Sequence, residues 1–339
     1  MEVSTTALSV TESSQAGHAR RTAAALASRL GFNEEAQGKV ALVASEAAKN
    51  LVAHAREGQL LLRALHAGPH VGVELLALDK GPGMVDVDRC MRDGYTTAGT
   101  GGSGLGAIRR MSTVFDIYSQ PGAGTALLAQ LWLSKPPRAE LEVGAVCVPM
   151  TGEEVCGDAW SLDTKQGRTV FLVADGLGHG PEAARASRAA VVSFLEQGTP
   201  DVTELLKGSH GELHSTRGAA VALASQRPGD TRLDFAGVGN IAASVLSLQG
   251  GGVQRMVSMN GTLGHQIHRV QSFSYTWSPD SVLVMCSDGL LTQWRVDGSP
   301  GLLHRHPSLV AGVLYRDFSR GRDDVTVLVA REAPRSNVP

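Results

Sequence analysis

The sequence predicts an α+β protein with two domains, and three observations support this. The chain has 339 residues, which is long for one hydrophobic core and suits two. Two consecutive prolines flanked by charges, in LSKPPRAELE, break helix and strand alike and are typical of a short stiff linker. After this linker, predicted strands outnumber predicted helices, which favours mainly antiparallel sheets with added helices. We therefore expect domains at 1–134 and 141–332, a linker at 135–140 and a tail at 333–339.

The first domain contains one strongly predicted helix, at 33–55. Its apolar residues Val40, Val43, Ala47 and Leu51 recur at i+3 and i+4 spacing, so one stripe faces a core. Asn33 can cap its N-terminus, and the two glutamates that follow suit the dipole of the first turn. Around this helix we expect strands at 4–10, 59–65, 70–78, 114–119 and 125–132, and helices at 18–30 and 104–112.

The second domain reads as strand-rich. Short apolar runs bounded by turn residues indicate most of its strands. We expect strands at 141–149, 169–174, 218–225, 231–237, 241–247, 281–287 and 324–330, and helices at 181–196, 201–207 and 307–318.

Composition excludes several classes of partner. The net charge is −2 and aromatic residues make up 4% of the chain, so neither a basic surface for nucleic acid or an anionic membrane nor a base-stacking platform is expected. The N-terminal MEVSTTALSV is polar and acidic, unlike a signal peptide, and apolar runs fall short of the roughly 20 residues of a membrane helix. The four cysteines are far apart, as expected of reduced buried thiols. We expect a cytoplasmic protein.

The first domain carries a pattern that suits a nucleotide. Glu46 and Asn50 are four residues apart, so they share one face of the long helix. Asp79 ends an apolar strand, and a carboxylate there can accept a hydrogen bond from an exocyclic amine such as that of adenine. Taken alone, the helical pair also fits a solvated helix face. The glycines that accompany these residues are Gly81, Gly83, Gly102, Gly104 and Gly106.

The glycines after Asp79 let the chain turn sharply beside a flat ring, and those at 102–106 precede a helix. Free amides at a helix N-terminus can hold phosphates, although such a run can also be a flexible loop. Magnesium prefers few protein ligands together with phosphate oxygens, so Asn50 could be a ligand. Glu46 could then orient or deprotonate an attacking hydroxyl.

Carboxylates border several predicted strands of the second domain. Any one Asp-Gly at a strand end can be a simple turn. Several acids that converge in one sheet assembly would repel each other unless cations lay between them. Oxygen ligands favour Mg²⁺ or Mn²⁺ over zinc, and two such ions about 4 Å apart can activate a water for attack on a phosphoester. The candidate ligands are Asp158, Asp175, the backbone carbonyl of Gly176, Asp288, Asp323 and Asp324.

Residues of about 10–133 resemble the GHKL ATP-binding fold, in particular the anti-sigma-factor serine kinases of the RsbT and RsbW kind. SEAAKNLVAHA is similar to their N box, DKGPG to the first glycine box, DGYTTAGTGGSGLGAIRRM to the lid and second glycine box, and GAGT with Thr125 to the closing motif. The resemblance implies ATP, magnesium held through Asn50, Glu46 as general base and Asp79 as adenine reader. It also implies a STAS-domain protein in a sigma-factor pathway as substrate, and it leaves open whether the chain forms a homodimer.

Residues of about 141–331 resemble the metal-dependent serine/threonine phosphatases of the SpoIIE type, particularly the RsbX-like branch. GDAW, VADGLGHG, GVGN, SDGL and RDDVTVLV occur in the order of that family. The resemblance implies an α-β-β-α sandwich with Asp158, Asp175, Gly176, Asp288 and Asp323 as the metal set. Asp324 ranks lower, because it stands where a neighbouring residue of the family's ligand is found.

The two resemblances together imply a switch regulator with opposed activities. We expect the first domain to phosphorylate a serine or threonine with ATP and Mg²⁺, and the second to remove phosphate with Mn²⁺ or Mg²⁺. The alternative is a phosphatase whose first domain only senses nucleotide or binds a partner. An intact Glu46 favours the first hypothesis, because a pure sensor would not need a base.

Overall fold

The structure is a computed structural model that describes residues 5–92 and 104–334 of the chain. Contacts along the backbone divide it into two compact units. The N-terminal unit comprises the residues up to Arg138 together with a later segment, Val296–Arg316. The C-terminal unit comprises Ala139–Arg295 and the residues from Asp317 onward. Each unit combines helices with antiparallel sheets, which confirms the predicted α+β class.

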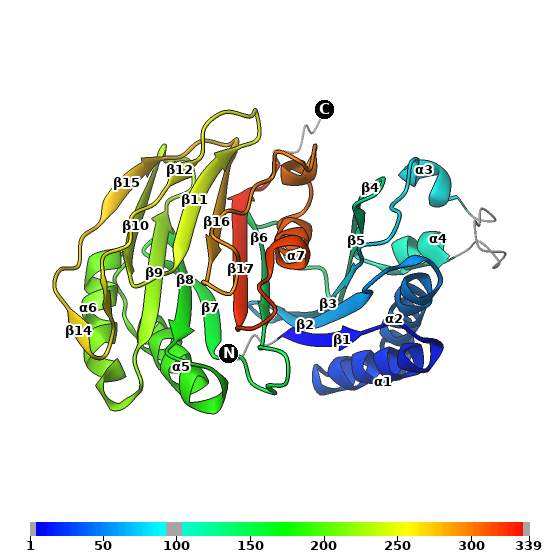
Figure 1. Ribbon diagram of the computed structural model, residues 1–339, viewed down its shortest axis with the longest axis horizontal. Helices are drawn as coiled ribbons and strands as arrows, with labels where there is room; N and C mark the ends of the chain where they lie inside the picture. The colour runs from blue at the N-terminus through cyan, green and yellow to red at the C-terminus, as the bar shows by residue number, and fades with distance from the viewer. Residues whose placement is uncertain (1–4, 93–103, 335–339) are drawn as a thin grey trace. The chain divides into compact units, whose positions relative to one another are not determined.

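The N-terminal unit is built on one five-stranded antiparallel sheet (Figure 1). Its strand order is β1-β2-β3-β5-β4, so chain neighbours pair except where β5 inserts between β3 and β4. Pairing of the central strands β2 and β3 is continuous from Gln59 opposite Leu78 to Ala67 opposite His70. The strands are β1 (Thr5–Ser9), β2 (Gln59–Ala67), β3 (His70–Leu78), β4 (Val114–Gln120) and β5 (Gly124–Trp132).

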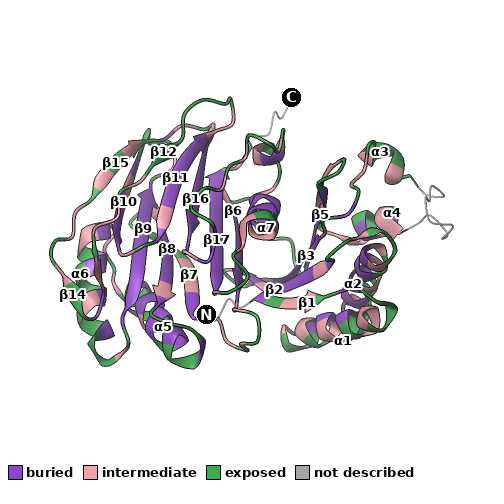
Figure 2. Cartoon of the chain, viewed as in Figure 1, coloured by how far each residue is buried: buried purple, intermediate pink, exposed green. Residues whose placement is uncertain are grey.

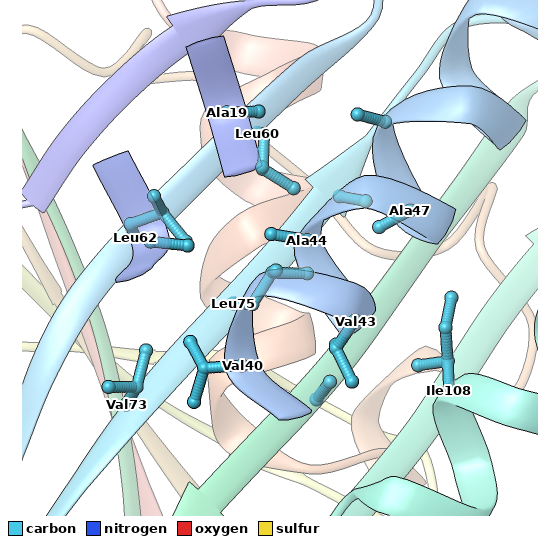
Figure 3. Close-up of a cluster of buried hydrophobic side chains, with 14 of the residues drawn as sticks. Ala19, Val40, Val43, Ala44, Ala47, Leu60, Leu62, Val73, Leu75 and Ile108 are labelled. Carbon is cyan, nitrogen blue, oxygen red and sulfur yellow. The ribbon is translucent and has the colours of Figure 1, made fainter. Parts of the chain in front are cut away.

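Helices α1 (Ser13–Arg29), α2 (Glu34–His54) and α4 (Gly104–Met111) share a core with one face of this sheet. As predicted, Asn33 caps α2, and its side-chain oxygen accepts the Ala36 amide at 2.9 Å. Figure 3 shows the stripe of α2 facing leucines and valines of β2 and β3. Each of these larger side chains contributes about 1.5–3 kcal/mol on burial, so the stripe fixes which face of α2 is left for polar residues. The short α3 (Val87–Cys90) follows β3.

The C-terminal unit contains two five-stranded antiparallel sheets. The first has the order β15-β10-β9-β8-β7 and the second β12-β11-β16-β17-β6. The first consists of β7 (Asp158–Lys165), β8 (Arg168–Gly176), β9 (Ala219–Gln226), β10 (Arg232–Val238) and β15 (Phe273–Thr276). The second consists of β6 (Leu141–Val148), β11 (Ala242–Ser247), β12 (Gln254–Arg255), β16 (Ser281–Cys286) and β17 (Val325–Glu332), and a small hairpin is formed by β13 (Gly261–Thr262) and β14 (Gln266–Ile267).

Strand β8 is buried on both faces (Figure 2). Phe171 and Val173 point into the core between the two sheets, whereas Leu172 and Ala174 point into a second core that contains residues of helices. The alternation follows from the two-residue period of a strand, and burial on both sides explains the continuous apolar run in the sequence. The covering helices are α5 (Gly180–Glu196) and α6 (Val202–Glu212).

The sequence predicts helix 307–318 correctly but groups it with the second domain. In the structure α7 (Pro307–Phe318) packs within the N-terminal unit as far as Arg316. The physical reason is that its polar partners, which include Glu74 and Asp116, lie on the sheet of that unit. In the part of the chain that the structure describes, no helix is both long and apolar enough to cross a membrane.

Candidate functional site

Glu46 and Asn50 lie on one face of α2, beside its buried stripe. One carboxylate oxygen of Glu46 pairs with Lys49 at 2.7 Å, on a side chain that is 21% exposed. The side-chain nitrogen of Asn50 is buried and has no hydrogen-bond partner among the described residues. A buried amide without a partner is costly, so this group suits a ligand.

The first residue of α4 packs directly against this pair. A Cβ added at Gly104 would lie 3.3 Å from the amide oxygen of Asn50 and 3.4 Å from a carboxylate oxygen of Glu46. The lack of a side chain at Gly104 therefore lets the start of α4 approach both side chains, while Gly106 is buried two residues further on; a phosphate-binding role for both glycines stays a prediction. Gly102 lies outside the described residues.

Asp79 follows directly on β3, and the backbone holds its carboxylate. The Gly81 amide donates to it at 2.6 Å, and the Asp79 amide donates to the Thr125 carbonyl at 2.9 Å. Burial raises the pKa of Asp79, and the backbone amides of Gly81 and Thr125 partly offset this. The carboxylate thus stands in a fixed orientation at the end of the strand, as expected of a hydrogen-bond acceptor for a base.

The loop after Asp79 requires glycine at one position in particular. Gly83 has a φ of +69°, and a Cβ there would lie 2.1 Å from the Gln120 carbonyl. Any larger residue would push this loop away from the β4–β5 turn. The Thr125 hydroxyl shares a hydrogen bond of 2.9 Å with the Ser119 hydroxyl, and the Thr125 carbonyl accepts the Asp79 amide, so the DKGPG and GAGT motifs meet where β3 ends and β5 begins.

In the C-terminal unit, strand pairing brings the predicted acids together. Asp158 begins β7 and Asp175 lies near the end of β8, and the two residues are direct partners across the strands. Asp288 follows β16, and Asp323 and Asp324 precede β17, the neighbour of β16. Asp158 and Asp324 are buried, at 5% and 3% exposure. Strand ends from both sheets therefore supply the carboxylates.

The hydrogen bonds of these acids differ in how many carboxylate oxygens they occupy. Asp158 accepts the Ser287 hydroxyl at 2.6 Å, and Asp288 accepts the Asn240 amide at 2.7 Å, so each keeps oxygen capacity for other partners. Both oxygens of Asp324 instead accept backbone amides, from Met150 and Gly157 at 2.8 and 2.9 Å. Asp324 therefore fastens the loop before β7, in keeping with its lower rank as a ligand.

The electrostatics show that the acids are close enough to interact. Burial raises the pKa of Asp175, and the charges of Asp158, Asp288 and Asp323 raise it further. Burial likewise raises the pKa of Asp158, where Asp324 adds to the effect and the Ser287 hydroxyl opposes it. Gathered carboxylates of this kind are destabilised as anions unless positive charge compensates them.

The donor set fits a hard divalent cation. Its candidate ligands are carboxylate oxygens and the carbonyl of Gly176, which suit Mg²⁺ or Mn²⁺. Among the described residues, no three His, Cys, Asp or Glu side chains already stand in a geometry that would enclose an ion. The fit therefore rests on ligand chemistry and on the shared electrostatics of Asp158, Asp175 and Asp288.

Comparison with known proteins gives one family match in each half of the sequence. Residues 10–131 match the histidine kinase-like ATPase domain family, and residues 165–332 match the family described as stage II sporulation protein E. The serine/threonine-protein kinase RsbT of Bacillus subtilis (strain 168) is 33% identical over 115 residues, which span 34% of this chain and 86% of RsbT. The chain belongs to the RsbT kinase family and carries a SpoIIE phosphatase domain.

Two solved structures resemble the chain. One comes from work on the bacterial stressosome as a modular system adapted to control secondary messenger signaling; it is 29% identical and covers 57% of this chain and 100% of its own, with a TM-score of 0.53. The other is RsbX in complex with magnesium, at 18% identity, 58% and 97% coverage and a TM-score of 0.49. The RsbT-like and SpoIIE matches identify the chain as a protein phosphatase with a kinase-like ATP-binding domain.

The structure adds residues to the SpoIIE domain that sequence reasoning did not assign. Ser287 and Asn240 contact predicted ligands, and Asn240 is the last residue of the GVGN motif. A hollow of about 580 Å³ opens at Leu177 and Gly178, directly after Asp175 and Gly176. Arg217 and His265 line it from distant parts of the chain, so local patterns gave no sign of them.

Proposed function

We propose that this chain is a bifunctional switch regulator that adds phosphate to serine or threonine with its N-terminal unit and removes it with its C-terminal unit. The observation that supports the second activity most directly is the pairing of Asp158 with Asp175 across β7 and β8, together with the 2.6 Å hydrogen bond to Asp158 from Ser287, the neighbour of Asp288. The alternative, a phosphatase with a nucleotide-sensing first domain, differs only in whether Glu46 acts as a base.

In the phosphatase reaction, Asp158, Asp175, Asp288, Asp323 and the Gly176 carbonyl would hold two divalent cations. Such ions, when bound, lower the pKa of water and neutralise charge on a phosphoryl group. Ser287 keeps Asp158 oriented, and Asn240 does the same for Asp288. The hollow beside Gly178 would receive the phosphorylated segment, with the Arg217 guanidinium available for its phosphate oxygens.

In the kinase reaction, Asp79 would accept the adenine amine and the N-terminal amides of α4 would bind phosphate. Asn50 would hold magnesium through its amide oxygen, next to Gly104. Glu46 would accept the proton of the substrate hydroxyl. Lys49 at 2.7 Å keeps one Glu46 oxygen engaged, which leaves the oxygen that faces Gly104 for this task.

We propose a STAS-domain regulator of a sigma-factor pathway as the protein substrate. The support is membership of the RsbT family and the likeness to a stressosome-related structure. Such a substrate would present a serine or threonine to one unit and its phosphorylated form to the other. Mn²⁺ or Mg²⁺ would serve the C-terminal unit, and Mg²⁺ the N-terminal one.

The phosphatase half is tested by phosphate release from a phosphoserine peptide and from p-nitrophenyl phosphate. We expect release with Mn²⁺, none with EDTA, and a loss of at least about 100-fold in Asp288→Asn, because even outer-shell partners of metal ligands are worth about 10–100-fold. Asp230→Asn, which changes an exposed carboxylate in the β9–β10 turn, is the matched control and should behave as wild type. Metal-independent release, or full activity in Asp288→Asn, would contradict the assignment.

A further inference from the structure

One segment of the chain packs in the N-terminal unit, although in the sequence it lies within the predicted phosphatase domain. Val296–Arg316 falls between the candidate ligands Asp288 and Asp323, yet packs in the N-terminal unit. In Figure 1, α7 lies over the face of the sheet opposite α1 and α2. This face carries Leu76 and Leu78 of β3, which are 2% and 1% exposed.

The start of α7 is anchored by a carboxylate of β4. Asp116 accepts the backbone amide of His306 at 2.8 Å and the Arg305 guanidinium at 3.3 Å. An acid at this position satisfies an otherwise free amide at the helix start and complements the helix dipole. The anchor fixes where the helix begins on the sheet.

The middle of α7 is anchored by close packing and by a buried acid. The Ser308 hydroxyl donates to Glu74 at 2.7 Å, and both residues are almost fully buried. A Cβ added at Gly312 would lie 3.1 Å from a methyl group of Leu78 and 3.6 Å from one of Leu76, so helix and strand are in direct contact. These two anchors set the rotation of α7 about its axis.

The end of α7 reaches the candidate adenine site. Arg316 donates from its guanidinium to the backbone carbonyl of Asp79 at 3.0 Å, and the Gln59 amide donates to the Tyr315 hydroxyl at 3.1 Å. Gly124 also lies close to the backbone carbonyl of Asp79. A Cβ added at Gly124 would lie 2.0 Å from this carbonyl oxygen. The peptide that carries Asp79 is therefore in contact with the start of β5 and with Arg316, both of which belong to the N-terminal unit.

We propose that Arg316 is a positioning residue of the nucleotide site, so that the segment 296–316 from within the phosphatase sequence completes the adenine-reading end of the kinase-like unit. This rests on the proposed function, because it takes Asp79 as the adenine acceptor. Without Arg316 the Asp79 peptide loses a charge-assisted hydrogen bond, and the orientation of its carboxylate depends on the backbone amides of Gly81 and Thr125 alone. Phe318 ends α7, and the candidate metal ligand Asp323 follows five residues later in the sequence.

The test is the affinity of the full-length protein for non-hydrolysable analogues of ATP and ITP with Mg²⁺, measured by isothermal titration calorimetry. Inosine lacks the exocyclic amine that Asp79 would accept. In Arg316→Ala we expect ATP-analogue affinity to fall about tenfold and ITP-analogue affinity by no more than about twofold, in line with the loss of one charged hydrogen bond. The preference for adenine should therefore collapse, which general destabilisation would not cause.

Two further variants keep the test decisive. Arg316→Met retains the aliphatic stem and should reproduce the Ala result if the alanine variant does not fold. Arg305→Ala removes an arginine from the same segment at the far end of α7 and should keep the wild-type ATP-to-ITP ratio. An unchanged ratio in both Arg316 variants, or an equal loss in Arg305→Ala, overturns the role of Arg316. A wild-type protein that binds neither nucleotide overturns the proposed nucleotide site itself, and the inference with it.

Discussion

Asn240 illustrates how one uncharged side chain can tune a cluster of acids. Its amide donates to one oxygen of Asp288 at 2.7 Å. Burial and the charge of Asp323 raise the pKa of Asp288, while Arg320 and Asn240 oppose them. The amide therefore favours the ionised carboxylate and limits its rotation, which are both properties that a metal ligand needs.

We predict that Asn240→Ala lowers the Mn²⁺-dependent rate about 10–100-fold, the usual effect of removing a partner of a metal ligand. The loss should be recovered in part at high Mn²⁺, because the ligand remains and only its orientation suffers. Phosphate release measured over a Mn²⁺ titration distinguishes this from unfolding. A variant with wild-type Mn²⁺ dependence would show that Asn240 does not orient Asp288.

The site residues that sequence could predict are those placed by local rules. Asp79, Asp175 and Asp288 each follow a recognisable apolar strand, and the structure puts all three at strand ends. Their partners could not be predicted in the same way, because Ser287 and Asp158 are 129 positions apart and Asn240 and Asp288 are 48 apart. Sequence-level reasoning identifies chemical groups, whereas hydrogen-bond partners depend on strand pairing across the fold.

At the scale of elements, the sequence predicted whether a segment is a helix or a strand better than it predicted which elements pack together. The cap at Asn33 and the stripe of α2 are local signals, and both were correct. Strand β7 was not predicted, because it is an edge strand with polar residues such as Asp163 and alternating exposure. Helix α7 was grouped with the second domain by its sequence position but packs in the N-terminal unit, since helical periodicity does not specify which core receives the apolar face.

The contact between α7 and its sheet depends on a buried charge. Glu74 accepts hydrogen bonds from Arg63, Gln130 and Ser308 across three strands and the helix. Burial alone would raise the pKa of Glu74, but Arg63, the Ser308 hydroxyl and His306 outweigh it and hold the pKa below its usual 4.5. A carboxyl with a lower pKa in the folded state adds stability above its unfolded pKa, and this is lost as the pH falls through the folded value.

We therefore predict that the N-terminal unit loses stability as the pH falls below about 4.5, and that part of this loss disappears in Glu74→Gln. Near neutral pH, Glu74→Gln should cost about 3–5 kcal/mol, because Arg63 is left buried without its counter-charge. The milder Ser308→Ala should cost about 1.5–3 kcal/mol, because it removes one hydrogen bond to a charged group. Unfolding in urea at each pH can be followed by a brief hydrogen-exchange pulse at one common pH and mass spectrometry of β2–β3 peptides.

Glu57→Gln is the matched control for this prediction. Glu57 is exposed and pairs with Lys80 at the surface, so the same chemical change should have little effect on urea midpoints at any pH. If Glu74→Gln and wild type lose stability in parallel as the pH falls, the charge of Glu74 does not contribute to the acid sensitivity of the unit.

At the scale of the whole molecule, two units for which we propose opposed activities share one chain. The segment that contributes Arg316 to the nucleotide unit lies between two candidate phosphatase ligands in sequence. Neither unit therefore consists of consecutive residues, whereas the motifs in the sequence predict two consecutive domains. The domain bounds of 1–134 and 141–332 therefore stay a prediction. They describe where the motifs lie in the sequence and not which residues pack together.

The opposed activities predict a specific pattern when all components are present. With ATP, Mg²⁺, Mn²⁺ and a STAS-domain substrate, wild type should keep phosphoprotein low, because each product of the first unit is a substrate of the second. Asp175→Asn should accumulate phosphoprotein, since it removes a candidate metal ligand without touching the nucleotide site. Adding Glu46→Ala to it should lower the rate of accumulation about 10²–10⁴-fold, as expected for loss of a general base.

Phosphoprotein can be followed by intact mass over time, with Asp230→Asn as a control that should match wild type. Accumulation in Asp175→Asn that is insensitive to Glu46→Ala would assign the kinase step to another base. No accumulation in Asp175→Asn, in a protein that still binds the ATP analogue, would favour the alternative in which the first unit senses nucleotide without catalysis. In that event the contact of Arg316 with Asp79 would still bring the segment 296–316 to the nucleotide site of the N-terminal unit.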